Sequence, residues 1–195
     1  FRDGYRKNEK LDENIITPTT KGVHDHPITR NEIIEQGYLS NEQYEYVSRK
    51  ALEIFSYGQM VAAHRGLILV DTKYEFGFLG DKIILIDELR TCDSSRYWKQ
   101  EIYDQRFSEG LEPEKMDKDC VRDFVNKNCD PYKDDLPEIP SELIERVQNV
   151  YMSYFNTFVD STSSFNQNNE SEAVTSRYII NNLENLVNNR VLILS

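Results

Sequence analysis

Two short apolar segments that each end in charged residues constrain this chain most. Residues 67–70 (Leu-Ile-Leu-Val) lead into an acid–x–lysine–x–acid pattern at 71–75, and residues 83–86 lead into Asp87. Runs of four apolar residues near turn residues are typical of buried strands. Charged groups at the ends of buried strands cost free energy unless they have partners. The pattern therefore indicates a site for a bound cation or an anionic ligand.

The turn between these two strands decides which charges meet. Alternation along one strand puts Asp71, Lys73 and Glu75 on the same face. A two-residue turn at Gly80 would send Asp87 to the opposite face, whereas a three-residue turn or a bulge would place Asp87 beside Lys73. The second arrangement is the one expected, since clustered carboxylates suit Mg²⁺ or Mn²⁺ bridging nucleotide phosphates. The alternative is a structural ladder of salt bridges on an exposed sheet.

Two further polar segments carry candidate ligand-binding residues. In residues 91–96, hydroxyl groups stand beside a guanidinium, which suits a phosphate group. The alternative there is an Asx or ST turn leading to Trp98. The segment 17–25 contains Lys21 and Asp25 among hydroxyl residues. A zinc site is not expected in it, because no further His or Cys is placed to complete one.

Length and composition exclude several classes of protein. With 195 residues the chain can form one large domain or a domain with an appendage. A net charge of −11 weighs against binding nucleic acid or anionic membranes, and no apolar run approaches the length of a membrane span. The three cysteines lack metal-binding spacing, which indicates free thiols in a reducing compartment such as the cytoplasm.

The apolar spacing predicts the order of helices and strands. Residues 1–39 are mostly irregular, and Ser40 with Gln43 forms a capping box at the start of a helix. The expected elements are a helix over 40–64, strands over 67–76 and 82–89, and helices over 117–127 and 141–159. After them come a polar linker over 160–172, an amphipathic helix and a short strand over 173–195, where a further domain could begin.

Taken together, these segments resemble one family, the phosphoribosylaminoimidazole-succinocarboxamide synthases, or SAICAR synthetases. The resemblance covers about residues 4–158, and the blocks LVDTKYEFG and DSSRYW are its most specific parts. The matching segments, in order, are ITPTTK (16–21), HDHPI (24–28), GLILVDTKYEFG (66–77), IILIDELRTCDSSRYW (83–98) and KMDKDCVRDF (115–124).

The resemblance implies a fold and a reaction. The implied fold is α+β, with residues 1–159 forming the C-terminal lobe of a two-lobed, kinase- or ATP-grasp-like structure in which an antiparallel hairpin packs with helices. The implied enzyme is an ATP-dependent ligase of purine biosynthesis that uses Mg²⁺. It would phosphorylate the carboxylate of carboxyaminoimidazole ribonucleotide and then join L-aspartate to it through an amide bond.

The resemblance also assigns roles to individual residues. Glu75 and Asp87 match carboxylates that bind Mg²⁺ and the nucleotide phosphates. Lys73 matches a lysine near the reacting carboxylate and the phosphates. Asp71 opens the same motif in a supporting or substrate-contacting role, and these two are the catalytic candidates. The expected substrate-binding residues are Lys21, Asp25, Asp93, Ser95 and Arg96, of which Ser95 and Arg96 match the residues that hold the 5′-phosphate of the ribonucleotide.

The chain departs from the family pattern in three respects. Cys92 stands where the family usually has proline, which is expected to make the turn before Ser95 less rigid. His26 stands where the family often has Asn or an acidic residue. The family's N-terminal ATP-binding lobe is expected to precede residue 1, so these 195 residues alone are expected to be inactive.

Partners and competing functions follow from the same pattern. The expected partners are the small-molecule substrates, with a homo-oligomer or a fused purine-pathway domain as a further possibility. One alternative is a nonenzymatic nucleotide-binding module derived from this fold. Another is a metal-dependent nuclease, which the net charge of −11 and the lack of a basic stripe weigh against.

Overall fold

A computed structural model of the chain describes residues 4–21, 25–116, 119–131, 133–158 and 191–194. The predicted linker over 160–172 and the predicted helix after it lie outside these residues. The chain divides into two compact units, which are described separately. The first unit comprises residues 1–12, 57–72 and 90–162, and the second comprises 13–56, 73–89 and 163–195.

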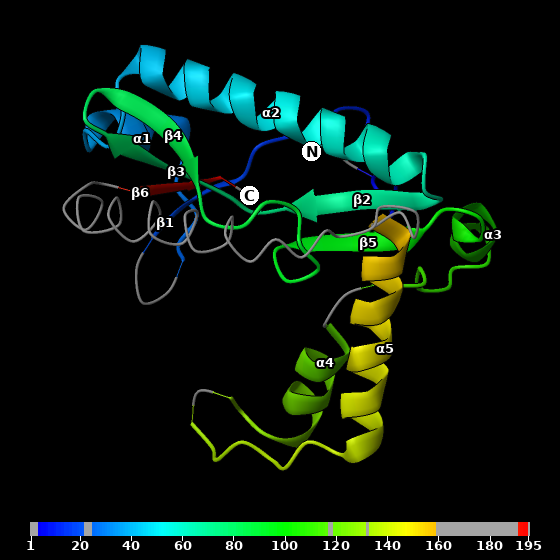
Figure 1. Ribbon diagram of the computed structural model, residues 1–195. Coiled ribbons are helices and arrows are strands. Elements are labelled where there is room, and N and C mark those ends of the chain that lie inside the picture. The colour runs from blue at the N-terminus through cyan, green and yellow to red at the C-terminus, as the bar shows by residue number, and fades with distance from the viewer. Residues whose placement is uncertain (1–3, 22–24, 117–118, 132, 159–190, 195) are drawn as a thin grey trace, which may run out of the picture. The chain divides into compact units, whose positions relative to one another are not determined.

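The second unit is built on a four-stranded antiparallel sheet with strand order β1-β6-β3-β4 (Figure 1). Its strands are β1 (Pro18–Thr20), β3 (Tyr74–Leu79), β4 (Lys82–Ile86) and β6 (Val191–Leu194). Side chains of β3 pack with the short helix α1 (Arg30–Glu35) and with the first part of α2 (Asn41–Ala63). The core of this unit consists of Ile28, Ile33, Leu39, Val47, Ala51, Tyr74 and Phe76.

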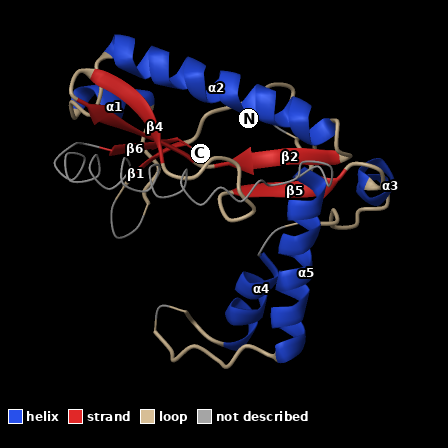
Figure 2. Ribbon diagram, in the orientation of Figure 1, coloured by secondary structure: helices blue, strands red, loops and turns tan. Residues whose placement is uncertain are grey.

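The first unit contains a two-stranded antiparallel sheet, the last part of α2 and further helices (Figure 2). The strands β2 (Leu67–Thr72) and β5 (Ser95–Lys99) pair with a bulge between Leu69 and Asp71. The further helices are α3 (Tyr103–Ser108), α4 (Asp119–Asn128) and α5 (Ser141–Phe158). Buried apolar residues of this unit are Ala62, Leu67, Leu69, Cys92, Tyr97 and Met116.

The predicted capping box of the long helix is confirmed. The backbone amide of Ser40 donates to the Gln43 side chain at 2.8 Å, and the amide of Gln43 donates to Ser40 Oγ at 3.2 Å. These two bonds satisfy backbone donors that the first turn of a helix leaves without partners. The helix ends at Ala63, and the turn that follows it closes at Gly66, whose φ of +72° is readily adopted only by glycine.

The predicted strand over 67–76 is wrong, because two strands take its place. β2 ends at Thr72 and β3 begins at Tyr74, and they belong to different sheets. The alternation that would put Asp71, Lys73 and Glu75 on one face is therefore interrupted at Lys73. Sheet partners distant in sequence decide such a break, and local alternation does not report them.

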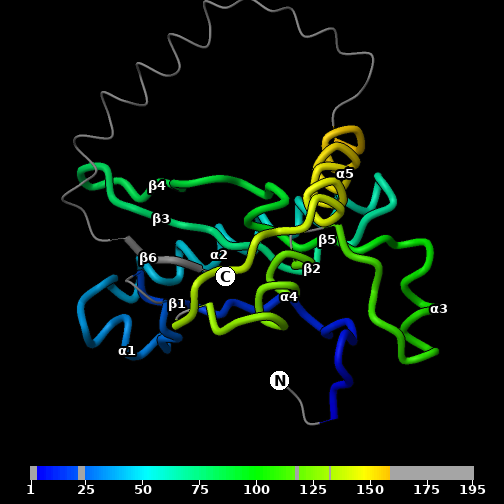
Figure 3. Tube along the Cα trace, turned by 90° about the horizontal axis from the view of Figure 1, so that it is seen from below, coloured from blue at the N-terminus to red at the C-terminus, as the bar shows by residue number. Residues whose placement is uncertain are grey.

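The expected three-residue turn of the hairpin is also wrong. Leu79 pairs with Lys82 and Glu75 pairs with Ile86, so a two-residue turn joins β3 to β4, which run as neighbouring tubes in Figure 3. Gly80, in this turn, has a φ of +60°. Strand β4 ends at Ile86, and Asp87 follows it with a left-handed φ of +67°. Asp87 thus lies outside the regular alternation of the strand.

Candidate functional site

A buried carboxylate forms the centre of the charged cluster in the second unit. Glu75 lies in the middle of the sheet on β3, and only 2% of it is exposed. Its Oε1 lies 2.9 Å from Lys73 Nζ, and its Oε2 accepts a hydrogen bond from Lys21 Nζ. The side chains of Lys73 and Lys21 are 40% and 49% exposed. One buried carboxylate therefore holds two half-exposed ammonium groups.

Local pairing brings Lys21 and Asp25 to this carboxylate. The amide of Thr20 donates to the carbonyl of His26 at 2.9 Å, and the amide of Ile28 donates to the carbonyl of Pro18 at 3.0 Å. The chain thus folds back on β1 and returns Asp25 toward the strand end that carries Lys21. Asp25 Oδ2 lies 3.9 Å from Lys73 Nζ, so Asp25 is the second acid of the cluster.

The charges of the cluster stabilise one another. The hydrogen bond to Glu75 raises the pKa of Lys73 above its ordinary value, outweighing desolvation, and the charges of Glu75, Asp25 and Asp87 act in the same direction. Burial alone would raise the pKa of Glu75, but hydrogen bonds from Lys21 and Lys73 outweigh burial and lower it. Glu75 is therefore ionised and Lys73 protonated at neutral pH.

Asp87 joins this cluster by a different route from the one expected. The register of the hairpin is the one that would send a regular strand residue at this position to the opposite face. Because Asp87 follows the end of β4 in a left-handed conformation, that rule does not apply to it. Its charge contributes to the raised pKa of Lys73. Strained backbone of this kind is frequent at functional sites.

Asp71 belongs to the first unit and is the partner of an arginine. Arg96 Nε donates to Asp71 Oδ1 at 2.9 Å, and Arg96 Nη2 donates to Asp71 Oδ2. This two-bond fork fixes the plane of the guanidinium, and both side chains remain about half exposed. Asp71 was expected to share a strand face with Lys73 and Glu75. It pairs with Arg96 instead.

Ser95 and Asp93 lie next to this pair in the chain and are held by hydrogen bonds. Ser95 is buried, with its Oγ 2.8 Å from Thr72 Oγ1 and its amide donating to the carbonyl of Thr91 at 3.0 Å. Asp93 accepts a hydrogen bond from the hydroxyl of Tyr151 on α5. The predicted residues thus form two groups, Lys21, Asp25, Lys73, Glu75 and Asp87 in the second unit and Asp71, Asp93, Ser95 and Arg96 in the first.

The candidate magnesium ligands provide the right type of donor but too few donors by themselves. Among the described residues, no three His, Cys, Asp or Glu side chains are grouped as a metal site. Mg²⁺ commonly binds through one or two carboxylates and completes its shell with phosphate oxygens and water. Glu75 and Asp87 fit this pattern in the presence of a nucleotide, although both oxygens of Glu75 already hold lysines.

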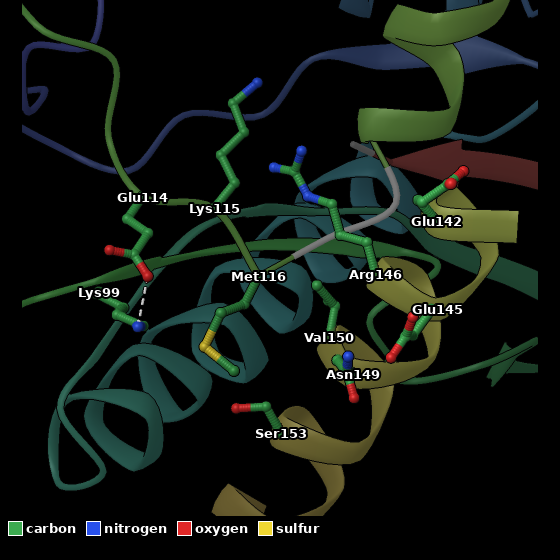
Figure 4. Close-up of a pocket in the computed structure, with 10 residues that line it drawn as sticks. All are labelled: Lys99, Glu114, Lys115, Met116, Glu142, Glu145, Arg146, Asn149, Val150 and Ser153. Carbon is green, nitrogen blue, oxygen red and sulfur yellow. Dashed lines mark ion pairs between the residues drawn. The ribbon is translucent and has the colours of Figure 1, made fainter. Parts of the chain in front are cut away.

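A separate hollow of about 390 Å³ lies in the first unit, between α5 and the segment after β5 (Figure 4). Its lining residues are Lys99, Glu114, Lys115, Met116, Glu142, Glu145, Arg146, Asn149, Val150 and Ser153. Basic and acidic side chains are equally represented in it, and Lys99 forms an ion pair with Glu114. None of the predicted site residues lines it, so the hollow adds nothing to either group.

Sequence comparison identifies relatives with named activities. The family described as SAICAR synthetase matches residues 1–139. The chloroplastic phosphoribosylaminoimidazole-succinocarboxamide synthase of Vigna aconitifolia is 55% identical over 145 residues, which is 73% of this chain and 42% of that protein. The synthase of the same name from Legionella pneumophila (strain Paris) is 44% identical and covers 86% of this chain and 55% of its own length. The chain thus spans about half the length of the curated relatives it matches.

Solved structures with the same fold agree with this assignment. The SAICAR synthase from Saccharomyces cerevisiae complexed with SAICAR aligns with a TM-score of 0.64 and 26% identity, over 84% of this chain and 52% of that chain. A type-2 SAICAR synthetase in complex with ADP, at 22% identity and a TM-score of 0.58, shares the fold over 80% of this chain and 55% of its own. The expected α+β fold is confirmed, and the chain belongs to the SAICAR synthetase family.

Proposed function

We propose that this chain carries part of the active site of an ATP-dependent ligase that joins L-aspartate to carboxyaminoimidazole ribonucleotide, giving SAICAR, ADP and phosphate. Relatives at 40–55% identity are named for this activity. The similar yeast structure contains SAICAR. We also propose that residues 1–159 act as the C-terminal lobe of the catalytic domain.

The pairing of buried Glu75 with Lys21 and Lys73 carries this proposal. Two ammonium groups share one buried carboxylate and remain 40% and 49% exposed, so they supply cationic donors on a chain whose net charge is −11. Such a pair suits the phosphate oxygens of a nucleotide and the negative charge that develops during phosphoryl transfer. The acid is buried while both of its lysines remain about half exposed, so their ammonium groups stay accessible to an anionic ligand, which favours a binding role.

The proposed reaction has two steps. An oxygen of the ribonucleotide carboxylate attacks the γ-phosphorus of ATP, ADP leaves, and an acyl phosphate forms. The amine of L-aspartate then attacks the acyl carbon, loses a proton and expels phosphate, which takes away the former carboxylate oxygen. Lys73 and Lys21 would neutralise the transferred phosphoryl group, and Asp25 would orient Lys73 from its other side.

Magnesium would complete the nucleotide site. When bound, Mg²⁺ neutralises the phosphate oxygens of the nucleotide. Glu75 and Asp87 would hold it together with those oxygens.

The first unit would bind the phosphate end of the ribonucleotide. Arg96 offers a planar guanidinium whose orientation Asp71 fixes, so we propose Asp71 as a positioning residue for Arg96. Ser95 and Asp93 belong to the same segment. This assignment gives Asp71 a different role from the catalytic one that the motif suggested.

Coupled release of ADP tests the proposal. In the full-length protein that contains these residues, ADP formation should require both L-aspartate and the ribonucleotide. Lys73→Met and Asp87→Asn should each abolish it. A nonenzymatic nucleotide-binding module would instead bind ADP without turnover, and that result, or unchanged turnover in both variants, would refute the ligase assignment.

The cellular location and the oligomeric state of the protein remain predictions. No helix within the described ranges is both long and apolar enough to cross a membrane. The relatives include chloroplastic and bacterial proteins, so the expected cytoplasmic location is a proposal that fractionation would test. A homo-oligomer or a fused purine-pathway domain is likewise proposed, and size determination of the purified full-length protein would test it.

A further inference from the structure

A buried and a half-buried phenol converge on one backbone carbonyl in the first unit. Arg90 begins the segment that leads to Ser95, here called the 90–95 loop, and has a left-handed φ of +56°. Its carbonyl accepts a hydrogen bond from the hydroxyl of Tyr97 on β5 at 3.1 Å and another from the hydroxyl of Tyr154 on α5. A carbonyl oxygen has two lone pairs, so these phenols can satisfy both.

The phenols are fixed in place by aromatic packing. Only 1% of Tyr97 is exposed, and its ring centroid lies 5.4 Å from that of Tyr154 and 5.6 Å from that of Phe158. Tyr154 and Phe158 lie 4.7 Å apart. Burial raises the pKa of both phenols, which therefore stay protonated and keep donating at neutral and mildly alkaline pH. The donors are thus oriented by the core of the unit rather than by the loop itself.

Further contacts hold the loop along its length. The hydroxyl of Tyr151, one turn before Tyr154 on α5, donates to Asp93. The guanidinium of Arg90 lies 5.4 Å from the ring centre of Tyr57. A Cβ at Gly58 would lie 2.7 Å from Arg90 Cδ, so the arginine side chain lies directly against α2 at this glycine. Both the backbone and the side chain of Arg90 are therefore held.

The left-handed region is energetically unfavourable for a non-glycine residue, which remains there only when surrounding contacts stabilise it. We propose that Tyr97 and Tyr154 are positioning residues that hold Arg90 in this conformation and so fix the 90–95 loop for phosphate binding at Ser95 and Arg96. The pair of phenols is called the tyrosine latch below. The phosphate part of this inference rests on the proposed function, whereas the latch itself rests on contacts within the first unit.

The test removes single hydroxyl groups. Tyr154→Phe and Tyr97→Phe delete only the donors, and Tyr5→Phe is the matched control, since the Tyr5 hydroxyl bonds the exposed Asp12 at 2.7 Å in the same unit. Loss of one such bond corresponds to about a tenfold change in an equilibrium constant. Amide hydrogen exchange in the 195-residue chain should accelerate about tenfold at Ser94 and Ser95 in both latch variants and stay unchanged in Tyr5→Phe.

Binding of ribose 5-phosphate, measured by calorimetry on the same chain, gives the functional readout. Each latch variant should raise the Kd about tenfold, with faster exchange confined to the 90–95 loop. Wild-type exchange and affinity in both latch variants would overturn the inference, as would faster exchange spread over the whole first unit. Arg96→Gln separates the two claims: an unchanged affinity in this variant refutes the proposed phosphate site, while the exchange rates still decide whether the latch exists.

Discussion

Replacing the buried acid of the second unit should destabilise the chain through its two lysines. Glu75→Gln keeps the size and shape of the side chain but removes the charge that Lys21 and Lys73 share. The amide can accept a hydrogen bond through only one of its two terminal atoms, and its nitrogen is placed against an ammonium group. The substitution therefore removes one of the two hydrogen bonds and takes the negative charge away from both ammonium groups.

The size of the effect follows from burial. A hydrogen bond to a charged group contributes about 1.5–3 kcal/mol when it is well shielded, and an exposed ion pair contributes about 0–1 kcal/mol. Glu75 is 3% exposed at its side chain, but its lysine partners are 40% and 49% exposed, so each pair falls between these limits. We expect Glu75→Gln to lower the free energy of unfolding by about 2 kcal/mol at pH 7.

Glu53→Gln on α2 is the matched control. Glu53 also has two cationic partners, Lys50 at 2.6 Å and Arg49 at 3.9 Å, but its side chain is 53% exposed. Solvent screens such a pair, so its removal should change the urea midpoint little. Urea unfolding followed by circular dichroism compares the two variants. Equal losses in both would refute the claim that the burial of Glu75 makes its lysine pairs strong.

The pH dependence gives a second check on Glu75. Its pKa is lowered in the folded chain from an ordinary value of 4.5, so its contribution to stability is complete above that pH. The contribution is lost as the pH falls through the lowered pKa, because the protonated acid no longer attracts the lysines. The difference in the free energy of unfolding between wild type and Glu75→Gln should therefore be constant from pH 5 to 8 and should decrease at acidic pH. A difference that increases at acidic pH would contradict the lowered pKa of Glu75.

Three further predictions concern the two units. Gly58→Ala places a Cβ 2.7 Å from Arg90 Cδ, and we expect a net loss of about 1 kcal/mol in thermal unfolding experiments, despite the better helix propensity of alanine. Thr72→Val removes the buried 2.8 Å bond to Ser95 and should cost about 1 kcal/mol in urea unfolding experiments. The pKa of Lys73 is raised above 10.5, so nucleotide affinity measured by calorimetry in the full-length protein should not fall between pH 7 and 9.

Local pattern predicted the strands and helices but not their partners. The apolar runs before Asp71 and Asp87 do form strands, and the capping box at Ser40 does begin a helix. The break at Lys73 was missed, because β2 and β3 pair with strands elsewhere in the chain. The alternating pattern of residue types continues through Lys73 in the sequence, although the strand itself ends there. Only the distant strand partners reveal this break.

The motif predicted which residues belong to the site but not how they are arranged in space. Glu75 and Lys21 are 54 positions apart, and only the pairing of β1 with residues 26–28 shows how the chain returns to the site. Asp87 enters the cluster through a left-handed backbone, a conformation that aspartate adopts more often than most residues but that the alternating strand pattern does not predict at this position. The apolar spacing predicts the helix over 141–159 but does not predict that the hydroxyls of Tyr151 and Tyr154 on it bind the 90–95 loop.

Transfer of oxygen during turnover tests the central claim most directly. The full-length protein would be given ATP, L-aspartate and carboxyaminoimidazole ribonucleotide labelled with ¹⁸O in its carboxylate, and the phosphate released would be analysed by mass spectrometry. If the carboxylate attacks ATP, each phosphate formed carries one labelled oxygen from the ribonucleotide. Phosphate without label, formed at the same rate as SAICAR, would contradict an acyl phosphate and the role proposed for the lysines around Glu75.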